Sequence, residues 1–322
     1  MPLISRRNWI GGSLFSTLAL NGGGSVARAA ASIPRPSMHL PLWPGDAPGG
    51  SGVTAEAAEI PRSAEGPADD TAFVHVRNPF LIHMPPVVPN GAALLMIPGG
   101  GYVRVAVGRG GRAMADYFAR LGFAVYTLVY RLPADGWAAG PDAPLQDAQR
   151  ALRLVRSLAV SDGFDAERVG ILGGSAGGHP AARLALRQDI ASYSPLDAVD
   201  RLPLAPKVAA LLFPVVATTG PYAHRGSVEQ MFPGGTTEVA AAPYAANALV
   251  APGTPPTFLA HAMDDRVVNW RNSALLMDKL ADASIAQQAH FFEAGGHGFG
   301  LEGPAAHWSD LFLEFARRHA LI

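Results

Sequence analysis

The sequence contains no cysteine among its 322 residues. This absence excludes disulfide bonds, zinc sites built from thiolates and a cysteine nucleophile. Charged residues are also scarce, at 16%, and the 25 basic and 26 acidic side chains nearly cancel. No basic stripe stands out, so we expect no nucleic-acid partner. Apolar residues make up 49% of the chain, a proportion that favours a sizeable buried core over disorder.

Patterns for a metal or a nucleotide cofactor are missing or incomplete. The sequence has no H-x-H or H-E-x-x-H pattern that would support a catalytic metal. The segment Gly108–Ala113 matches the dinucleotide fingerprint G-x-G-x-x-A, but it does not directly follow a predicted strand. The next predicted strand ends on Tyr130 and Arg131 rather than on an acidic residue. We therefore expect no NAD, no FAD and no metal.

Residues 1–29 have the pattern of an export signal rather than of a folded element. Ser5–Ile10 resembles the twin-arginine motif, an apolar stretch follows to about Leu20, and Ala27–Ala29 offers small residues at the two positions that a signal peptidase reads. A membrane anchor is less favoured, because the apolar stretch is shorter than the roughly 20 residues that span a bilayer. We predict export through the twin-arginine pathway, to the periplasm or beyond, with no membrane attachment after cleavage.

Behind this signal, apolar strand-like runs alternate with segments of helical periodicity. We treat residues 30–70, rich in proline at their start, as an N-terminal extension and residues 71–322 as one domain, because no linker or repeat divides them. Continuous apolar strands alternating with amphipathic helices are typical of an α/β fold with a mostly parallel sheet and helices on both faces. The expected strands are residues 72–84, 92–97, 123–130, 168–172, 208–216, 257–260 and 289–293, and the expected helices are residues 111–121, 144–160, 176–188, 270–283 and 305–320.

A candidate nucleophile lies between one of these strands and the helix that follows it. Gly173–Gly178 reads Gly-Gly-Ser-Ala-Gly-Gly and matches G-x-S-x-G. The motif alone also occurs in ordinary glycine-rich turns, but the strand–turn–helix context is the one in which it marks a nucleophile. Glycine neighbours allow a tight turn, and the amides at the start of the helix favour negative charge. We therefore assign the nucleophile to Ser175.

A serine hydroxyl needs a histidine to accept its proton and a carboxylate to orient that histidine. His297 lies in a glycine-rich loop after the last predicted strand, and we predict that it is the base, with His224 as its nearest rival. Asp264 and Asp265 both follow the strand that ends near residue 260. The Val-Val pair that follows favours Asp265 as the orienting acid, which leaves Asp264 to cap the loop.

The segment Pro98–Tyr102, read Pro-Gly-Gly-Gly-Tyr, predicts an oxyanion hole. The tetrahedral intermediate of acyl transfer needs at least two preset amide donors. We expect one from Ala176, directly after the nucleophile, and another from Gly100 or Gly101. A simple flexible turn is the alternative.

Short segments along almost the whole chain match one family. They are Leu42–Gly45, Pro98–Tyr102, Tyr130–Pro133, Pro144–Arg150, Gly174–His179, His224–Ser227, Thr254–Leu259, Asp264–Val268 and Gly295–Gly300. Through them, residues 40–320 resemble the α/β-hydrolase superfamily, and more narrowly the exported bacterial carbohydrate esterases of the acetylxylan esterase type, some of which are labelled xylanases. The resemblance implies a triad of Ser175, Asp265 and His297.

The resemblance also implies a function. It implies that this chain is a serine esterase that removes short acyl groups, acetyl above all, from plant polysaccharide or oligosaccharide. A serine peptidase and a lipase-like enzyme are alternatives on the same fold, whereas the complete set of serine, acid and histidine argues against a non-catalytic binding protein. The polysaccharide, the choice between acetyl and feruloyl groups, and the oligomeric state stay open. Segments 132–143 and 217–250 are expected to form binding loops, and the candidate substrate contacts are Tyr102, Trp137, His224 and Trp270.

Overall fold

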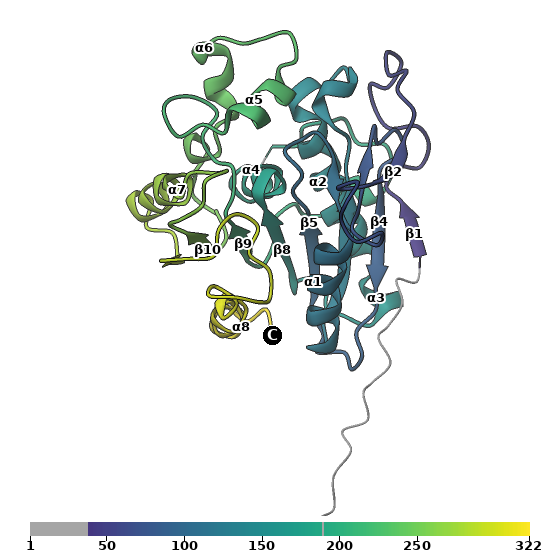
Figure 1. Ribbon diagram of the computed structural model, residues 1–322. Coiled ribbons are helices and arrows are strands. Elements are labelled where there is room, and N and C mark those ends of the chain that lie inside the picture. The colour runs from purple at the N-terminus through teal and green to yellow at the C-terminus, as the bar shows by residue number, and fades with distance from the viewer. Residues whose placement is uncertain (1–37, 189) are drawn as a thin grey trace, which may run out of the picture. The chain divides into compact units, whose positions relative to one another are not determined.

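The computed structural model describes residues 38–188 and 190–322, and two sheets organise them (Figure 1). The main sheet has eight strands in the order β1-β4-β7-β5-β8-β9-β10-β11. Strand β4 is antiparallel to both of its neighbours, and all pairs from β7 to β11 are parallel. These strands are β1 (Met38–Pro41), β4 (Phe80–Met84), β5 (Ala93–Ile97), β7 (Ala124–Val129), β8 (Val169–Gly174), β9 (Ala209–Leu212), β10 (Thr257–Ala262) and β11 (Gln287–Phe292). The expected α/β class with a mostly parallel sheet is confirmed.

The second sheet is small and antiparallel. It contains β2 (Ala58–Pro61), β3 (Thr71–Val74) and β6 (Val105–Ala106), in the order β2-β3-β6. Because β6 closely follows the glycine-rich segment after β5, this sheet lies beside the loop that is expected to bind the oxyanion.

Helices cover both faces of the main sheet (Figure 1). The helices α2 (Ala143–Ser157), α4 (Gly178–Leu186) and α7 (Arg271–Asp282) pack on one face, and α1 (Arg109–Arg120) and α8 (Trp308–Arg318) pack on the other. The short α-helices are α3 (Ala159–Asp162), α5 (Arg225–Met231) and α6 (Glu238–Ala241). The 3₁₀ turns are η1 (Pro133–Asp135), η2 (Gly140–Asp142), η3 (Ser175–Gly177), η4 (Val199–Arg201), η5 (Ala242–Tyr244) and η6 (Ala246–Ala248).

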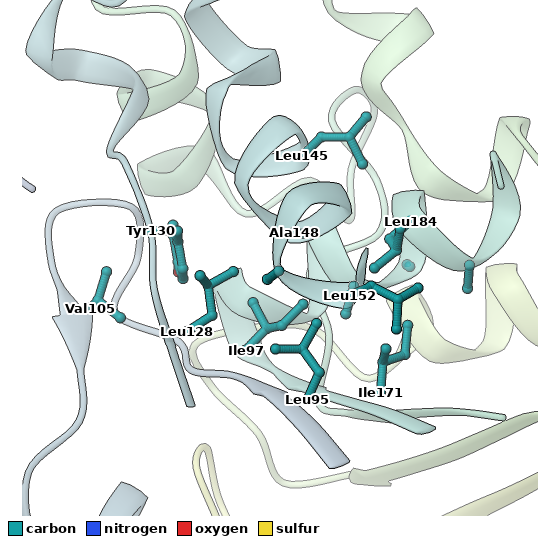
Figure 2. Close-up of a cluster of buried hydrophobic side chains, with 14 of the residues drawn as sticks. Leu95, Ile97, Val105, Leu128, Tyr130, Leu145, Ala148, Leu152, Ile171 and Leu184 are labelled. Atoms are coloured by element: carbon teal, nitrogen blue, oxygen red, sulfur yellow. The ribbon is translucent and has the colours of Figure 1, made fainter. Parts of the chain in front are cut away.

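The core between the sheet and α2 follows from the spacing of apolar residues. Leu145, Ala148 and Leu152 recur every three or four residues and face Leu95 and other aliphatic strand residues (Figure 2). Every residue of β5 and of β7 is buried. Burying one such aliphatic side chain contributes about 1.5–3 kcal/mol to stability, so the sheet and its helices form a rigid base for the loops above it.

A buried ion pair fixes the end of β7 to α2. The Arg131 guanidinium lies 2.9 Å from the Asp147 carboxylate, and both side chains are fully buried. The same carboxylate accepts the backbone N–H of Arg131 at 2.7 Å. Removing one partner of a buried pair typically costs about 3–5 kcal/mol. Two of the segments that carry the family resemblance therefore serve the scaffold.

Three expected elements are interrupted where the backbone changes direction. Residues 72–84 form two strands, because His75 adopts a left-handed φ of +50° and the chain turns before β4. The strand expected over residues 208–216 ends at Leu212, because Phe213 has a φ of +38°. The helix expected over residues 144–160 is divided at Leu158 into α2 and α3.

Other elements occur where the sequence predicted none. The extension expected over residues 30–70 contributes β1, which pairs with β4, and β2, which pairs with β3. Helix α5 lies within the expected loop 217–250, and its N-cap is His224, whose Nδ1 accepts the N–H of Ser227 at 3.2 Å. Histidine is not a typical N-cap residue, so the pattern gave no start signal.

The export signal expected over residues 1–29 falls outside the described residues. Among the residues that are described, no helix is both long enough and apolar enough to cross a membrane.

Candidate active site

Ser175 occupies a strained turn between β8 and α4. Its φ is +55°, a left-handed value that is uncommon for a residue with a side chain. The turn packs tightly against the end of β5. A Cβ at position 177 would lie 2.2 Å from the carbonyl oxygen of Pro98, so only glycine fits there. Strained residues of this kind persist where the surrounding structure holds them, and they concentrate at functional sites.

The three residues expected to form the triad lie in one line of hydrogen bonds. The Ser175 hydroxyl donates to Nε2 of His297 at 2.8 Å, and Nδ1–H of His297 donates to Oδ2 of Asp265 at 2.7 Å. The aspartate follows β10 and the histidine follows β11, two adjacent parallel strands. Their carboxyl ends meet at one edge of the sheet, which brings together side chains 32 positions apart.

The two neighbouring aspartates have different roles in this geometry. Oδ1 of Asp265 accepts the N–H groups of Val267 and Val268 at 2.8 and 3.0 Å. Asp264 points elsewhere, and its Oδ1 accepts the N–H of Gly296 at 2.8 Å. The structure thus places Asp265 against His297, whereas Asp264 holds the loop that carries the histidine.

The hydrogen bonds around Asp265 decide its charge. Burial by itself raises the pKa of this carboxyl, but the hydrogen bonds from His261, His297 and the N–H of Val267 outweigh burial and hold the pKa well below its usual range. The carboxylate is therefore ionised at any pH where a neutral histidine can act as a base. An ionised acceptor fixes the tautomer of its partner histidine.

Sequence reasoning missed a second histidine at this site. His261, on β10, is fully buried, and its Nε2–H lies 3.2 Å from Oδ2 of Asp265 and 3.0 Å from the carbonyl oxygen of Val268. Its Nδ1 accepts the hydroxyl of Ser273 at 2.8 Å. The available signal was a polar residue at the end of an otherwise apolar buried strand.

Phe213 was also missed, because its backbone conformation is not visible in the sequence. Its ring packs edge-on against His297 with a centroid distance of 5.1 Å, and against Phe299 at 4.7 Å. The left-handed φ that ends β9 turns this ring toward the histidine. An aromatic wall of this kind limits the rotation of the imidazole.

The glycine-rich segment after β5 forms a tight loop beside the serine. Gly100 and Gly101 have positive φ values of +139° and +67°. The carbonyl oxygen of Gly100 accepts the N–H groups of Val103 and Arg104, both at 3.2 Å, and a Cβ on Gly100 would lie 2.0 Å from the carbonyl oxygen of Arg104. Both glycines line the same cavity as Ser175, and Ala176 is buried next to the serine.

That cavity has a volume of about 520 Å³. Ser175 and His297 lie in its lining together with His224 and apolar residues such as Met114 and Phe299. His224, the expected rival of His297, makes no hydrogen bond to the serine; its Nδ1 lies 2.8 Å from the hydroxyl of Ser227. It therefore forms part of the wall of the cavity.

Three of the four residues that we predicted to contact the substrate do not line this cavity, because their aromatic side chains pack beneath or beside the loops. Tyr102 is 1% exposed, and Trp137 is buried with the guanidinium of Arg131 4.8 Å from its ring. Trp270 packs against Phe291 at 5.5 Å and does not line the cavity. Of the four, His224 alone lines it.

Tyr102 instead belongs to a buried hydrogen-bonded chain that supports the glycine-rich loop. Its hydroxyl lies 2.7 Å from Nδ1 of His179, and Nε2–H of His179 donates to the carbonyl oxygen of Tyr244 at 2.7 Å. Burial, reinforced by nearby Arg183, lowers the pKa of His179 to about 3. The neutral ring can accept from Tyr102 while donating to Tyr244. These two hydrogen bonds connect the loop after β5 to α4 and to segment 217–250.

A second cavity, of about 430 Å³, lies against α5 and α6. Its lining includes Thr218, Arg225, Glu229 and Glu238 but none of the three residues of the hydrogen-bonded line. Segment 217–250 therefore borders both cavities, with His224 on the side of Ser175.

Two family models and several known proteins are similar to this chain. A family model described as BD-FAE matches residues 82–208, and the Prolyl oligopeptidase family matches residues 216–321. The chain is 30% identical over 205 residues to an endo-1,4-beta-xylanase B of Butyrivibrio fibrisolvens, and 28% identical over 220 residues to an acetylxylan esterase of Xylanibacter ruminicola. The matches cover 64% and 67% of this chain but only 32% and 42% of those relatives.

Solved structures share the fold along most of the chain. The acetyl ester-xyloside bifunctional hydrolase from Caldicellulosiruptor lactoaceticus is 26% identical, with a TM-score of 0.71, over 91% of this chain and 100% of that one. The carboxylesterase Cest-2923 from Lactobacillus plantarum is 21% identical, with a TM-score of 0.62, over 83% of this chain and 98% of that one. At that identity, the second likeness concerns the fold alone.

Proposed function

This chain belongs to the α/β-hydrolase superfamily, and we propose that it is a serine esterase that removes short acyl groups, acetyl above all, from plant polysaccharide or its oligosaccharides. The observation that carries the proposal is the line of hydrogen bonds from Ser175 through His297 to Asp265, with distances of 2.8 and 2.7 Å. The esterases among its relatives support the same chemistry.

In the proposed mechanism, Oγ of Ser175 attacks the acyl carbonyl carbon while Nε2 of His297 takes the hydroxyl proton. Asp265 stabilises the resulting imidazolium without accepting its proton. The carbonyl oxygen becomes an oxyanion and accepts the N–H groups of Ala176 and of Gly100 or Gly101. Losing one such donor typically costs about 10²–10³ in turnover.

His297 then gives its proton to the oxygen of the leaving sugar, and the C–O bond of the ester breaks. The acyl group remains on Ser175. A water molecule, deprotonated by His297, attacks the carbonyl carbon of this acyl-enzyme. The bond between the acyl group and Oγ of Ser175 then breaks, His297 returns the proton to Oγ, and the carboxylic acid leaves. The same histidine therefore acts as a base and as an acid in each half of the cycle.

A peptidase is the second candidate, because residues 216–321 match the Prolyl oligopeptidase family. That stretch carries Asp265 and His297, which both chemistries use. The acetylxylan esterase relative favours the ester substrate.

We also propose that the chain is exported through the twin-arginine pathway, on the evidence of its first 29 residues.

The test is a panel of matched substrates. Acid release from acetylated xylan, acetylated pectin and feruloylated arabinoxylan would be measured beside the cleavage of nitrophenyl esters from acetyl to octanoyl and of aminoacyl-nitroanilide amides. We expect acetate release, and a kcat/KM that is highest for the shortest esters. Faster cleavage of the amides would favour the peptidase, and a steady rise in kcat/KM with chain length would favour a lipase.

A further inference from the structure

In the part of the chain that the structure describes, the cavity at Ser175 is lined by basic side chains but by no acidic ones. Two arginines, Arg62 and Arg104, contribute to its lining, whereas none of the described residues that line it is an aspartate or a glutamate. The chain as a whole carries 26 acidic and 25 basic residues, so this imbalance is local. A neutral acetyl ester of a neutral sugar has no anionic group with which a guanidinium could form an ion pair.

Arg104 is held at the edge of the oxyanion loop by its backbone. Its N–H donates to the carbonyl oxygen of Gly100 at 3.2 Å, and its Cγ would lie 3.2 Å from a Cβ placed on that glycine. One guanidinium N–H donates to the carbonyl oxygen of Arg62 at 3.3 Å. Within the described ranges, no carboxylate lies within the 4.0 Å of an ion pair with Arg104. Its charge is therefore open to a ligand in the cavity.

Arg62 lies next to it, on the turn after β2. Its guanidinium forms an ion pair with Asp70 at 3.3 Å, and the two side chains are 43% and 23% exposed. An exposed pair of this kind contributes at most about 1 kcal/mol. An anionic ligand can therefore displace Asp70 from Arg62. Alternatively, Arg62 can attract the ligand electrostatically while its ion pair with Asp70 stays intact.

We propose that the ester substrate carries a carboxylate, and that Arg104, assisted by Arg62, binds this carboxylate while Ser175 attacks the ester. The proposal rests on the esterase function above and narrows it to acidic substrates. A guanidinium offers paired N–H donors whose geometry matches a carboxylate. The positive field of the two arginines also raises the local concentration of an anionic substrate.

The carboxylate can come from either side of the ester. It belongs to the sugar when an acetylated oligosaccharide carries a uronic acid, and to the acyl group when a dicarboxylic acid is bound through one end. Both sources present the same group to Arg104, and paired substrates distinguish them.

The first pair of substrates is an acetylated xylo-oligosaccharide with and without one glucuronic acid substituent. The second pair is the nitrophenyl monoester of succinic acid and nitrophenyl butyrate. For each pair, the ratio of kcat/KM for the charged to the neutral ester is measured with the full chain. We expect a ratio of about 10 or more in at least one pair, because hydrogen bonds to charged groups contribute about 1.5–3 kcal/mol.

Variants identify the residue that sets the ratio. Arg104→Gln should lower it toward 1, Arg104→Lys should retain part of it, and Arg62→Gln should lower it less. Arg317→Gln removes the same charge from an exposed site on α8, outside the cavity lining, and should leave the ratio unchanged. In the wild-type protein, 1 M salt should also reduce the ratio, because salt screens exposed charges.

Two results would overturn the inference. One is a ratio near or below 1 in both pairs with undiminished cleavage of nitrophenyl acetate, which leaves the proposed function intact. The other is a high ratio that neither arginine variant nor salt changes. Absence of cleavage for every ester would overturn the esterase proposal together with this one.

Discussion

His261 and His297 donate to the same atom, Oδ2 of Asp265, at 3.2 and 2.7 Å. One histidine is fully buried, whereas the other lines the cavity. The buried ring is fixed on its far side by Ser273. The buried His261 therefore fixes the orientation of the Asp265 carboxylate, which in turn orients His297.

This arrangement predicts an effect of His261 on the pH profile. His261→Phe removes one N–H donor from Oδ2, so the carboxylate should attract the proton on His297 more strongly. We expect the acid limb of kcat/KM to move to higher pH and kcat to fall by about tenfold, the scale of one lost hydrogen bond to a charged group. Ser273→Ala, which keeps Nε2 in place, should move the limb less. An unmoved acid limb in His261→Phe would limit this residue to a packing role.

Substitution of Asp265 should lower turnover far more than substitution of Asp264. Asp265→Asn should lower turnover by about 10⁴, because an amide cannot hold the correct histidine tautomer. Asp264→Asn should cost no more than about tenfold, since an exposed hydrogen bond contributes about 1 kcal/mol. Steady-state kinetics on a nitrophenyl ester compares them under identical conditions. The opposite ranking would assign the acid to Asp264.

Activity should fall with decreasing pH through the loss of one proton acceptor. His297 must be neutral to take the serine proton, whereas the hydrogen bonds that outweigh burial hold the pKa of Asp265 well below its usual range, so it stays ionised. A plot of log kcat/KM against pH should therefore have a slope of about 1 on the acid side. A slope near 2 would show that a second group titrates with it.

His179 should make the fold sensitive to acid. Its pKa in the folded protein is about 3, below the ordinary histidine value of about 6.5. The unfolded chain therefore binds a proton first, and stability is lost as the pH falls from about 6.5 to about 3, at up to about 1.4 kcal/mol per pH unit. His179→Gln cannot titrate, so the difference in stability between wild type and variant should shrink across this window. Urea unfolding at several pH values measures this difference, and a constant gap would contradict the assignment.

Much of this site could be predicted because its signals are local. The strand–turn–helix context of Ser175 and the glycine-rich loop before His297 are both visible in short windows of sequence. The geometry places Ser175, His297 and Asp265 within hydrogen-bonding distance, as expected. Their catalytic roles remain a prediction.

The features that could not be predicted depend on contacts between distant parts of the chain. Phe213 ends β9 through a left-handed φ that its residue type disfavours. Tyr102 was expected to face the substrate, but its hydroxyl reaches a histidine 77 positions away and its ring is buried. Aromatic residues in loops look alike in a sequence, whether they face a ligand or fill the space beneath the loop.

The most direct test of the central claim is to locate the covalent intermediate. A nitrophenyl dialkyl phosphate transfers its phosphoryl group to an activated serine, forming an O–P bond and releasing nitrophenolate. We expect intact mass spectrometry to show one adduct per chain, peptide mapping to place it on Ser175, and activity to be lost in parallel. Ser175→Ala should fold, take up no adduct and lose ester hydrolysis by about 10⁴ or more. An adduct on another residue, or a Ser175→Ala protein that retains near-normal activity, would contradict the account.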